Sequence, residues 1–308
     1  MTRIVAALLG ILASAYGAAE QFPLPLDGSS VVGEIRMVKT RQEDTLLDVA
    51  RREGLGYEDI VRANPAVNPW VPGEGTEVVL PTRYVLPAVP WTGIVINLPE
   101  LRLYYFPKGD EPVVETYPIS IGRMDWGTPL GRTRVISKVV DPSWYPPQSI
   151  RDEHAADNRP LPRVVPAGPD NPLGRHAMRL AIPGYLIHGT NRPAGVGMRV
   201  THGCIRMFPE DIERLFERIP LETTVHIINQ PYKMGWGPQG ELVMEAHLPL
   251  EEDRDNQRFG PTELTRLFVG ATQERLVAVD WSRAEEIRAA AQGIPEPISV
   301  GELAALSQ

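Results

Sequence analysis

Proline and glycine interrupt this chain so often that a bundle of long helices is excluded. There are 31 prolines and 27 glycines among 308 residues, below the combined share of about 25–30% that is typical of disordered chains. Between residues 91 and 229, short apolar runs alternate with turn signals such as Thr128-Pro129-Leu130-Gly131. Short strands joined by turns of this kind predict an all-β sandwich or barrel for this region.

The expected elements divide the chain into three parts. The all-β region, residues 92–229, has expected strands at 93–98, 101–106, 115–121, 133–140, 184–187 and 224–228, and one helix at 209–216. Residues 36–82 predict a small α+β unit, with a strand at 36–39, helices at 45–52 (capped by Asp44 or Thr45) and 57–63, and a strand at 78–80. Residues 230–308 predict a mixed C-terminal extension with helices at 261–269 and 284–292, the second opened by a capping box from Ser282 to Glu285.

The first residues have the pattern of a secretory signal peptide. Arg3 precedes an apolar run from Ile4 to Leu12, and small residues end at Ala19. The run is far shorter than the ~20 apolar residues of a spanning helix. We therefore expect cleavage near Ala19 and an exported, periplasmic chain without a transmembrane anchor. The chain carries 31 basic and 39 acidic residues and no basic block, which argues against a nucleic-acid partner.

Export makes the single cysteine, Cys204, informative. Structural cysteines of exported proteins usually form pairs, so an unpaired one indicates a reactive thiol, an intermolecular bridge or a small buried side chain. His188 stands where an expected strand runs out into a glycine turn, and His202 and Gly203 directly precede the cysteine. An imidazole near a thiol favours the nucleophilic thiolate, and the missing side chain of Gly203 lets backbone N–H groups approach a developing oxyanion.

These motifs resemble the signature of the YkuD-type L,D-transpeptidases. The matching stretches are His188-Gly189-Thr190-Asn191 and Thr201-His202-Gly203-Cys204-Ile205-Arg206-Met207, with weaker matches at 128–131, 142–144 and 171–174. The resemblance covers residues 92–229. Family members usually have serine before His-Gly-Cys, and Thr201 keeps the hydroxyl.

The resemblance implies a peptidoglycan enzyme without a metal or cofactor. Cys204 would attack the carbonyl of the L-centre of diaminopimelate in a tetrapeptide stem, release D-alanine and form a thioester. The acceptor amine would come from a second diaminopimelate or from the C-terminal lysine of an outer-membrane lipoprotein. The implied roles are as follows: His188 is the base, the Gly189 carbonyl orients its ring, His202 and Gly203 frame the oxyanion site, Arg206 positions the loop or a substrate carboxylate, and Tyr185 lines the donor pocket.

Residues 36–82 are similar to a LysM module, a glycan-binding domain. The similarity rests on Asp44-Thr45-Leu46, Asn64-Pro65, Pro72-Gly73 and Val79-Leu80-Pro81, although Glu43 replaces the usual glycine before Asp44. The alternative is a spacer that binds nothing. If the unit only adds avidity, its deletion should weaken binding to sacculi and spare activity on soluble muropeptides.

Three other functions stay open at this stage. His188, His202 and Cys204 have the number and type of ligands of a catalytic zinc site. The same thioester chemistry could end in hydrolysis, as in an L,D-carboxypeptidase, and the whole chain could be a non-enzymatic wall-binding protein. The remaining histidines stand outside any recognisable group and are expected to be structural: His154, His176, His226 and His247.

Overall fold

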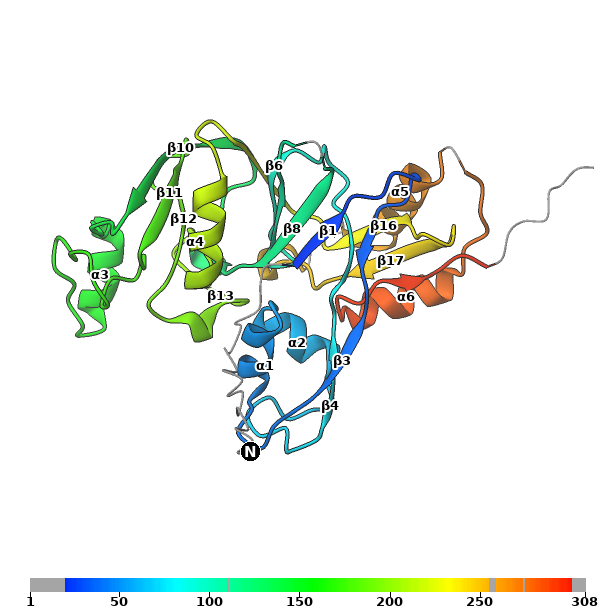
Figure 1. Cartoon of the computed structure of the whole chain (residues 1–308), viewed down its shortest axis with the longest axis horizontal. Helices are drawn as coiled ribbons and strands as arrows, with labels where there is room; N and C mark the ends of the chain where they lie inside the picture. The colour runs from blue at the N-terminus through cyan, green and yellow to red at the C-terminus, as the bar shows by residue number, and fades with distance from the viewer. Residues whose placement is uncertain (1–19, 110, 255–258, 274, 301–308) are drawn as a thin grey trace, which may run out of the picture.

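The computed structural model describes residues 20–109, 111–254, 259–273 and 275–300 (Figure 1). The predicted signal peptide, residues 1–19, lies outside them. Within the described residues, no helix combines the length and the apolar character that crossing a membrane requires.

The main body is one curled sheet of nine strands, which confirms the mainly β class. α4 (Pro209–Arg218) packs against β11 and buries Ile212 and Leu215 in the core that the sheet surrounds (Figure 1). The strand order is β1 (Glu20–Pro23), β8 (Val113–Pro118), β7 (Arg102–Phe106), β6 (Gly93–Asn97), β15 (Thr224–Ile228), β10 (Gly131–Val140), β11 (His176–Leu180), β12 (Leu186–His188) and β14 (Ile205–Arg206).

The structure adds a helix and several strands to the elements expected in this region. α3 (Gln148–Ala156) is a second helix where only 209–216 was expected, and β11 is an additional strand. α3 buries only Ile150, so its sequence lacks the apolar repeat that announces a helix. Ahead of this region, residues 20–23 form an unexpected strand, because β1 pairs with β8 at the edge of the sheet. The two remaining strands here, β9 (Ile121–Gly122) and β13 (Arg199–Thr201), pair with each other.

Residues 36–82 form the expected strand–helix–helix–strand unit. β3 (Arg36–Lys39) pairs with β4 (Glu77–Leu80), and α1 (Leu46–Arg52) and α2 (Tyr57–Ala63) lie between them in sequence. Thr45 caps α1 in a capping box with Asp48. The Asn64 side chain ends α2 by bonding backbone groups of Ile60 and Val79, each at 2.8 Å. The flanking strands β2 (Val31–Gly33) and β5 (Arg83–Val85) also pair.

This unit is held directly against the main sheet domain. The first N–H groups of α2, from Tyr57 and Glu58, donate to the carbonyls of Val196 and Gly197 at 3.3 and 3.2 Å. Those N–H groups have no partner within their own helix, so the loop at 196–197 takes the place of a side-chain cap. Arg51 adds a bidentate pair with Glu210 at 2.8 and 3.0 Å.

The C-terminal part is a small sheet covered by two helices. β16 (Tyr232–Trp236), β17 (Leu242–Ala246) and β18 (Glu296–Pro297) form the sheet, and α5 (Pro261–Ala271) and α6 (Trp281–Ala290) pack on it. Asp280 caps α6 by accepting from the N–H of Arg283 at 3.0 Å. The predicted capping box from Ser282 is therefore wrong, since Ser282 already lies in the first turn.

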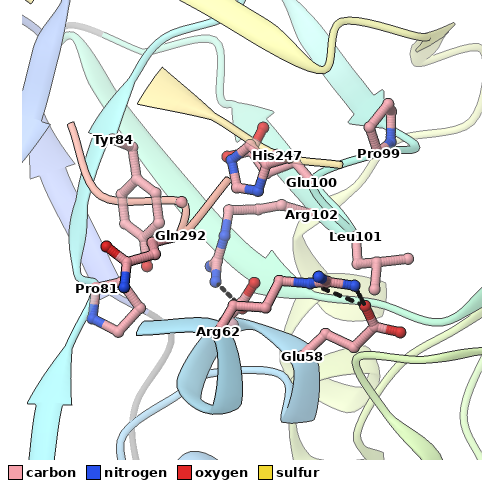
Figure 2. A pocket seen from close by; sticks show the side chains of 12 residues that line it. Glu58, Arg62, Pro81, Tyr84, Pro99, Glu100, Leu101, Arg102, His247 and Gln292 are labelled. Carbon is pink, nitrogen blue, oxygen red and sulfur yellow. Dashed lines mark hydrogen bonds and ion pairs between the residues drawn. The ribbon is translucent and has the colours of Figure 1, made fainter. Parts of the chain in front are cut away.

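A buried group of charged side chains joins the three parts. Lys233 of β16 lies 2.9 Å from Glu100 and 2.8 Å from Glu245, and His247 contacts Glu245 at 2.6 Å. Beside them, Arg102 of β7 pairs with Asp59 of α2 at 2.7 Å; Figure 2 shows Arg102, Glu100 and His247 converging above α2. His247 was expected outside any group and belongs to this one.

Candidate active site

Parallel strand pairing brings the two stretches of the signature, 188–191 and 201–207, together. β12 ends at His188 and lies parallel to β14, with His188 opposite Arg206 and Ile187 opposite Ile205. The N–H of Met207 donates to the His188 carbonyl at 2.9 Å. Because Cys204 directly precedes β14, this register places the thiol loop beside the start of β12, level with Leu186 and two residues before His188.

The His188 ring is oriented by a backbone carbonyl. Its Nδ1 lies 2.6 Å from the Gly189 carbonyl oxygen. A carbonyl only accepts, so Nδ1 carries the proton and Nε2 keeps its lone pair. The ring is buried, and burial together with the nearby Arg206 charge lowers the pKa of His188 to about 4, against the opposing effect of the Gly189 and Leu173 carbonyls. At neutral pH the imidazole is uncharged and able to accept a proton.

Gly189 is held in place by close packing. Its N–H donates to the His176 carbonyl at 3.0 Å. A Cβ here would lie 3.1 Å from Cγ2 of Ile212 on α4. A larger residue would therefore push the orienting carbonyl away from the His188 ring.

Cys204 is a free, half-buried thiol. Its Sγ donates to the Gly184 carbonyl over 3.7 Å. Burial raises the pKa of the thiol, while a hydrogen bond from the Leu186 backbone and the charge of Arg206 act in the opposite direction. The resting thiol is thus protonated at neutral pH, and the proton has to leave when the sulfur attacks.

The loop before the thiol is closed by two threonine hydroxyls. Thr201 Oγ1 donates to the Cys204 carbonyl at 2.6 Å and accepts from the Gly203 N–H at 3.2 Å. Thr128 Oγ1 donates to the Gly203 carbonyl at 2.8 Å and accepts from the N–H of Gly122 at 3.1 Å. Within the described part of the chain, the N–H of Cys204 has no acceptor, which leaves it available to an oxyanion.

Gly203 and Tyr185 fit against each other. Gly203 has φ +100°, a conformation that side chains other than glycine rarely adopt. A Cβ at this position would lie 2.9 Å from Cε1 of Tyr185. The Tyr185 hydroxyl reaches the Gly127 carbonyl at 3.4 Å, so its ring forms one side of the thiol loop.

His202 faces a different set of groups from His188. Its Nε2 lies 3.1 Å from Glu153 Oε2 on α3, and its ring packs edge-on against Trp126 with centroids 5.0 Å apart. Among the described residues, one group of potential metal ligands has its ligand atoms within 4.8 Å of one another: Glu100, Glu245 and His247. The positive charge beside these carboxylates is already supplied by Lys233. His188, His202 and Cys204 do not form such a group there.

Arg206 brings an unpaired positive charge to the site. Its Nε is buried without a hydrogen-bond partner, and no carboxylate of the described part of the chain is among the groups that shift its pKa. Burial and, to a smaller extent, the charge of Arg192 lower the pKa of Arg206. A half-buried guanidinium beside a second one favours binding of an anion.

Sequence reasoning missed Glu153. It lies on a polar helix without periodic apolar residues, about fifty positions before His202. No local pattern connects the two residues, and only the folded chain shows the contact.

Known proteins resemble the chain over this same region and beyond. Residues 92–227 match the family model YkuD, described as the L,D-transpeptidase catalytic domain. The probable L,D-transpeptidase YcfS of Escherichia coli K12 is 44% identical over 243 residues, which cover 77% of this chain and 76% of the relative. The probable L,D-transpeptidase YbiS of the same strain is 40% identical, covering 84% and 86%. The probable L,D-transpeptidase ErfK/SrfK of Salmonella typhimurium is 37% identical over 300 residues, covering 94% and 95%.

Proposed function

The chain belongs to the L,D-transpeptidase family, and on that premise we propose that it is a cysteine enzyme acting on peptidoglycan stem peptides in the periplasm. The observation that carries the proposal is the buried His188 ring, which is uncharged at neutral pH and whose Nδ1–H is directed at the Gly189 carbonyl. A base must be uncharged and oriented by a third group to take a thiol proton.

In the proposed first step, Sγ of Cys204 attacks the carbonyl of the L-centre of diaminopimelate while His188 Nε2 takes the thiol proton. The tetrahedral intermediate places its oxyanion at the free N–H of Cys204, a donor worth about 3–4 kcal/mol in comparable sites. Collapse breaks the amide bond, and His188 returns the proton to the leaving amine of D-alanine. A thioester on Cys204 remains.

In the second step an amine attacks the thioester. His188 takes the proton of that amine, the C–S bond breaks, and the sulfur leaves as a thiolate that is protonated again. The amine of a second diaminopimelate gives a cross-link, and the C-terminal lysine of a lipoprotein gives an attached protein. Water in the same position gives hydrolysis.

Arg206 supplies the proposed anchor for a substrate carboxylate. Its side chain is half-buried, its Nε is buried without a partner, and it lies on β14, the strand next to the one that carries His188. The stem has carboxylates on its terminal D-alanine and on diaminopimelate. Binding one of them would compensate the charge that the fold leaves unpaired.

Residues 36–82 are proposed to bind glycan. Tyr57 and Trp70 form a ring pair with centroids 6.1 Å apart, and Trp70 is 59% exposed. Tyr57 also lines a cavity of about 120 Å³ between α1 and the segment 193–196. Trp70→Ala should weaken binding to sacculi, whereas Met37→Ala, which removes an exposed side chain on the same unit, should not. Equal binding by both variants would favour the spacer interpretation.

The function is tested by incubating the mature chain with tetrapeptide muropeptides, with and without a peptide that ends in the lipoprotein lysine. The expected products are D-alanine and an amide between the tripeptide stem and an amine. Free tripeptide without any conjugate would favour the carboxypeptidase alternative. Absence of D-alanine release would contradict the proposal.

A further inference from the structure

We propose that Glu153 is a positioning residue that holds the His202 ring, and through it the loop 201–204, in the geometry that the reaction needs. The inference rests on the proposed function, in which His202 and Gly203 frame the oxyanion site. It adds a residue from α3, a helix outside the signature.

The contacts of Glu153 leave the His202 ring little freedom. Glu153 Oε2 lies 3.1 Å from His202 Nε2, and Oε1 pairs with the guanidinium of Arg123. Arg123 in turn is fixed by its own N–H, which donates to the Thr201 carbonyl at 3.1 Å. Trp126 packs against the other side of the ring. The Glu153 carboxylate therefore links the His202 ring to Arg123, which in turn bonds the backbone of Thr201, the residue before His202.

The carboxylate also fixes the tautomer of His202. An ionised carboxylate only accepts, so Nε2 carries a proton and Nδ1 of the neutral ring is left as an acceptor. Bonds to Arg123 and His202 lower the pKa of Glu153, which keeps it ionised. Burial lowers the pKa of His202, Glu153 raises it, and Arg123 and His154 lower it. Of the groups that face the ring, Glu153 is the one that opposes the loss of its proton.

The position of His202 matters because the next residue is conformationally unusual. Gly203 stands at φ +100° and carries the carbonyl and N–H that Thr128 and Thr201 hold. A rotation of the His202 ring away from Trp126 would be transmitted to Gly203 through one peptide bond. The N–H of Cys204 would then point away from the oxyanion.

The test compares Glu153→Ala, Glu153→Gln and the control Asp152→Ala. Asp152 lies next to Glu153 on α3 and accepts from Gln148 at 2.6 Å, without contact to His202. Glu153→Ala should lower kcat about 10–100-fold, the range of one hydrogen bond to a charged group, with KM changed less than about 3-fold. Glu153→Gln should recover most of this loss, because its amide oxygen accepts the same bond. Asp152→Ala should match the wild type.

Two further measurements separate positioning from general damage. First, the ¹⁵N shifts of His202 in the wild type should show the Nε2–H tautomer, and the His202 titration midpoint should move to lower pH in both Glu153 variants. Second, adding Glu153→Ala to His202→Ala should lower kcat by less than about 2-fold. The effects of two residues are not additive when one acts through the other. An equal loss in both backgrounds, or an unchanged His202 titration, would overturn the proposal.

These readouts do not depend on the identity of the substrate. The His202 titration, and the rate at which iodoacetamide alkylates Cys204, are measured on the full chain without peptidoglycan. A protein that titrates as expected but releases no D-alanine would refute the proposed function and leave the Glu153–His202 relation supported. If the protein releases D-alanine but the Glu153 variants leave the His202 titration unchanged, the proposed function is supported and the Glu153–His202 relation is refuted.

Discussion

Replacing Asp59 by alanine should markedly lower the free energy of unfolding, because Asp59 joins residues 36–82 to the main sheet through a buried ion pair. Asp59 and Arg102 pair at 2.7 Å with side chains that are 9% and 1% exposed. Removing one partner of a buried pair leaves the other charge without compensation, which costs about 3–5 kcal/mol. In the variant Arg102 still contacts the face of the Tyr84 ring at 4.4 Å and the Thr116 hydroxyl at 3.4 Å. These contacts partly compensate its charge, so we take the lower end of that range for the pair. Asp59 also accepts the N–H of Gly56, the residue just before α2, at 3.0 Å, a bond worth about 1 kcal/mol.

The expected loss is therefore about 4 kcal/mol in the free energy of unfolding. At about 2–4 °C per kcal/mol for a chain of this size, Tm should fall by about 10 °C. The assay is urea and thermal unfolding followed by circular dichroism. Glu58→Ala is the matched control, because it removes a neighbouring carboxylate whose ion pair is a half-exposed one with Arg62 four residues along α2, worth about 0.5 kcal/mol. If Asp59→Ala costs no more than this control, the α2 contact does not stabilise the fold as reasoned.

This contact also changes what deletion of residues 36–82 should do. The sequence pattern alone suggested a tethered module whose removal spares activity on soluble stems. In the structure, the deletion removes the partner of Arg102 and frees the carbonyls at Val196 and Gly197. We now expect the shortened chain to be destabilised, so point variants such as Trp70→Ala are the better test of glycan binding.

Three more predictions concern the site. The free energy of unfolding should fall by about 3 kcal/mol as the pH drops from about 6.5 to about 4, because His188 takes up its proton at a higher pH in the unfolded chain than in the folded one. His188→Gln should make the free energy of unfolding, measured with urea, less dependent on pH in this range, and an unchanged dependence would contradict the assignment. Gly203→Ala should destabilise the chain by at least about 1–2 kcal/mol, since φ is +100° and the new Cβ meets Tyr185; unaltered unfolding with full activity would contradict the packing argument. Thr201→Val should slow acylation of Cys204 about 10-fold or more, because it removes two hydrogen bonds that Thr201→Ser keeps. The measurement is the single-turnover acylation rate of each variant, and equal rates would contradict the role of the hydroxyl.

Short-range chemistry made part of this fold predictable. α1 begins at the Thr45 cap and α2 ends before Asn64-Pro65, because caps and prolines act on their immediate neighbours. His188 stands at the end of its strand, as the glycine turn after it indicated. The nucleophile, the base and the orienting glycine could be proposed because they lie within two short motifs.

The features of the fold that could not be predicted from the sequence depend on contacts between residues far apart in the chain. β1 pairs with β8 across about ninety residues, and Lys233 reaches Glu100 from a different sheet. α3 is stabilised where it lies by Ile150 and by the contacts of Glu153, not by an apolar stripe. The different surroundings of His188 and His202 follow from β12–β14 pairing and from α3. No local pattern contains that information.

The most direct test of the central claim is the intact mass of the chain after brief exposure to a tetrapeptide stem without an acceptor amine. We expect a covalent tripeptide acyl adduct on Cys204, removed by hydroxylamine as a thioester should be. Cys204→Ser should show no such adduct, because its hydroxyl has a far higher pKa than a thiol, while its unfolding curve stays within about 0.5 kcal/mol of the wild type. An adduct on another residue, or turnover by Cys204→Ser at the wild-type rate, would contradict the account.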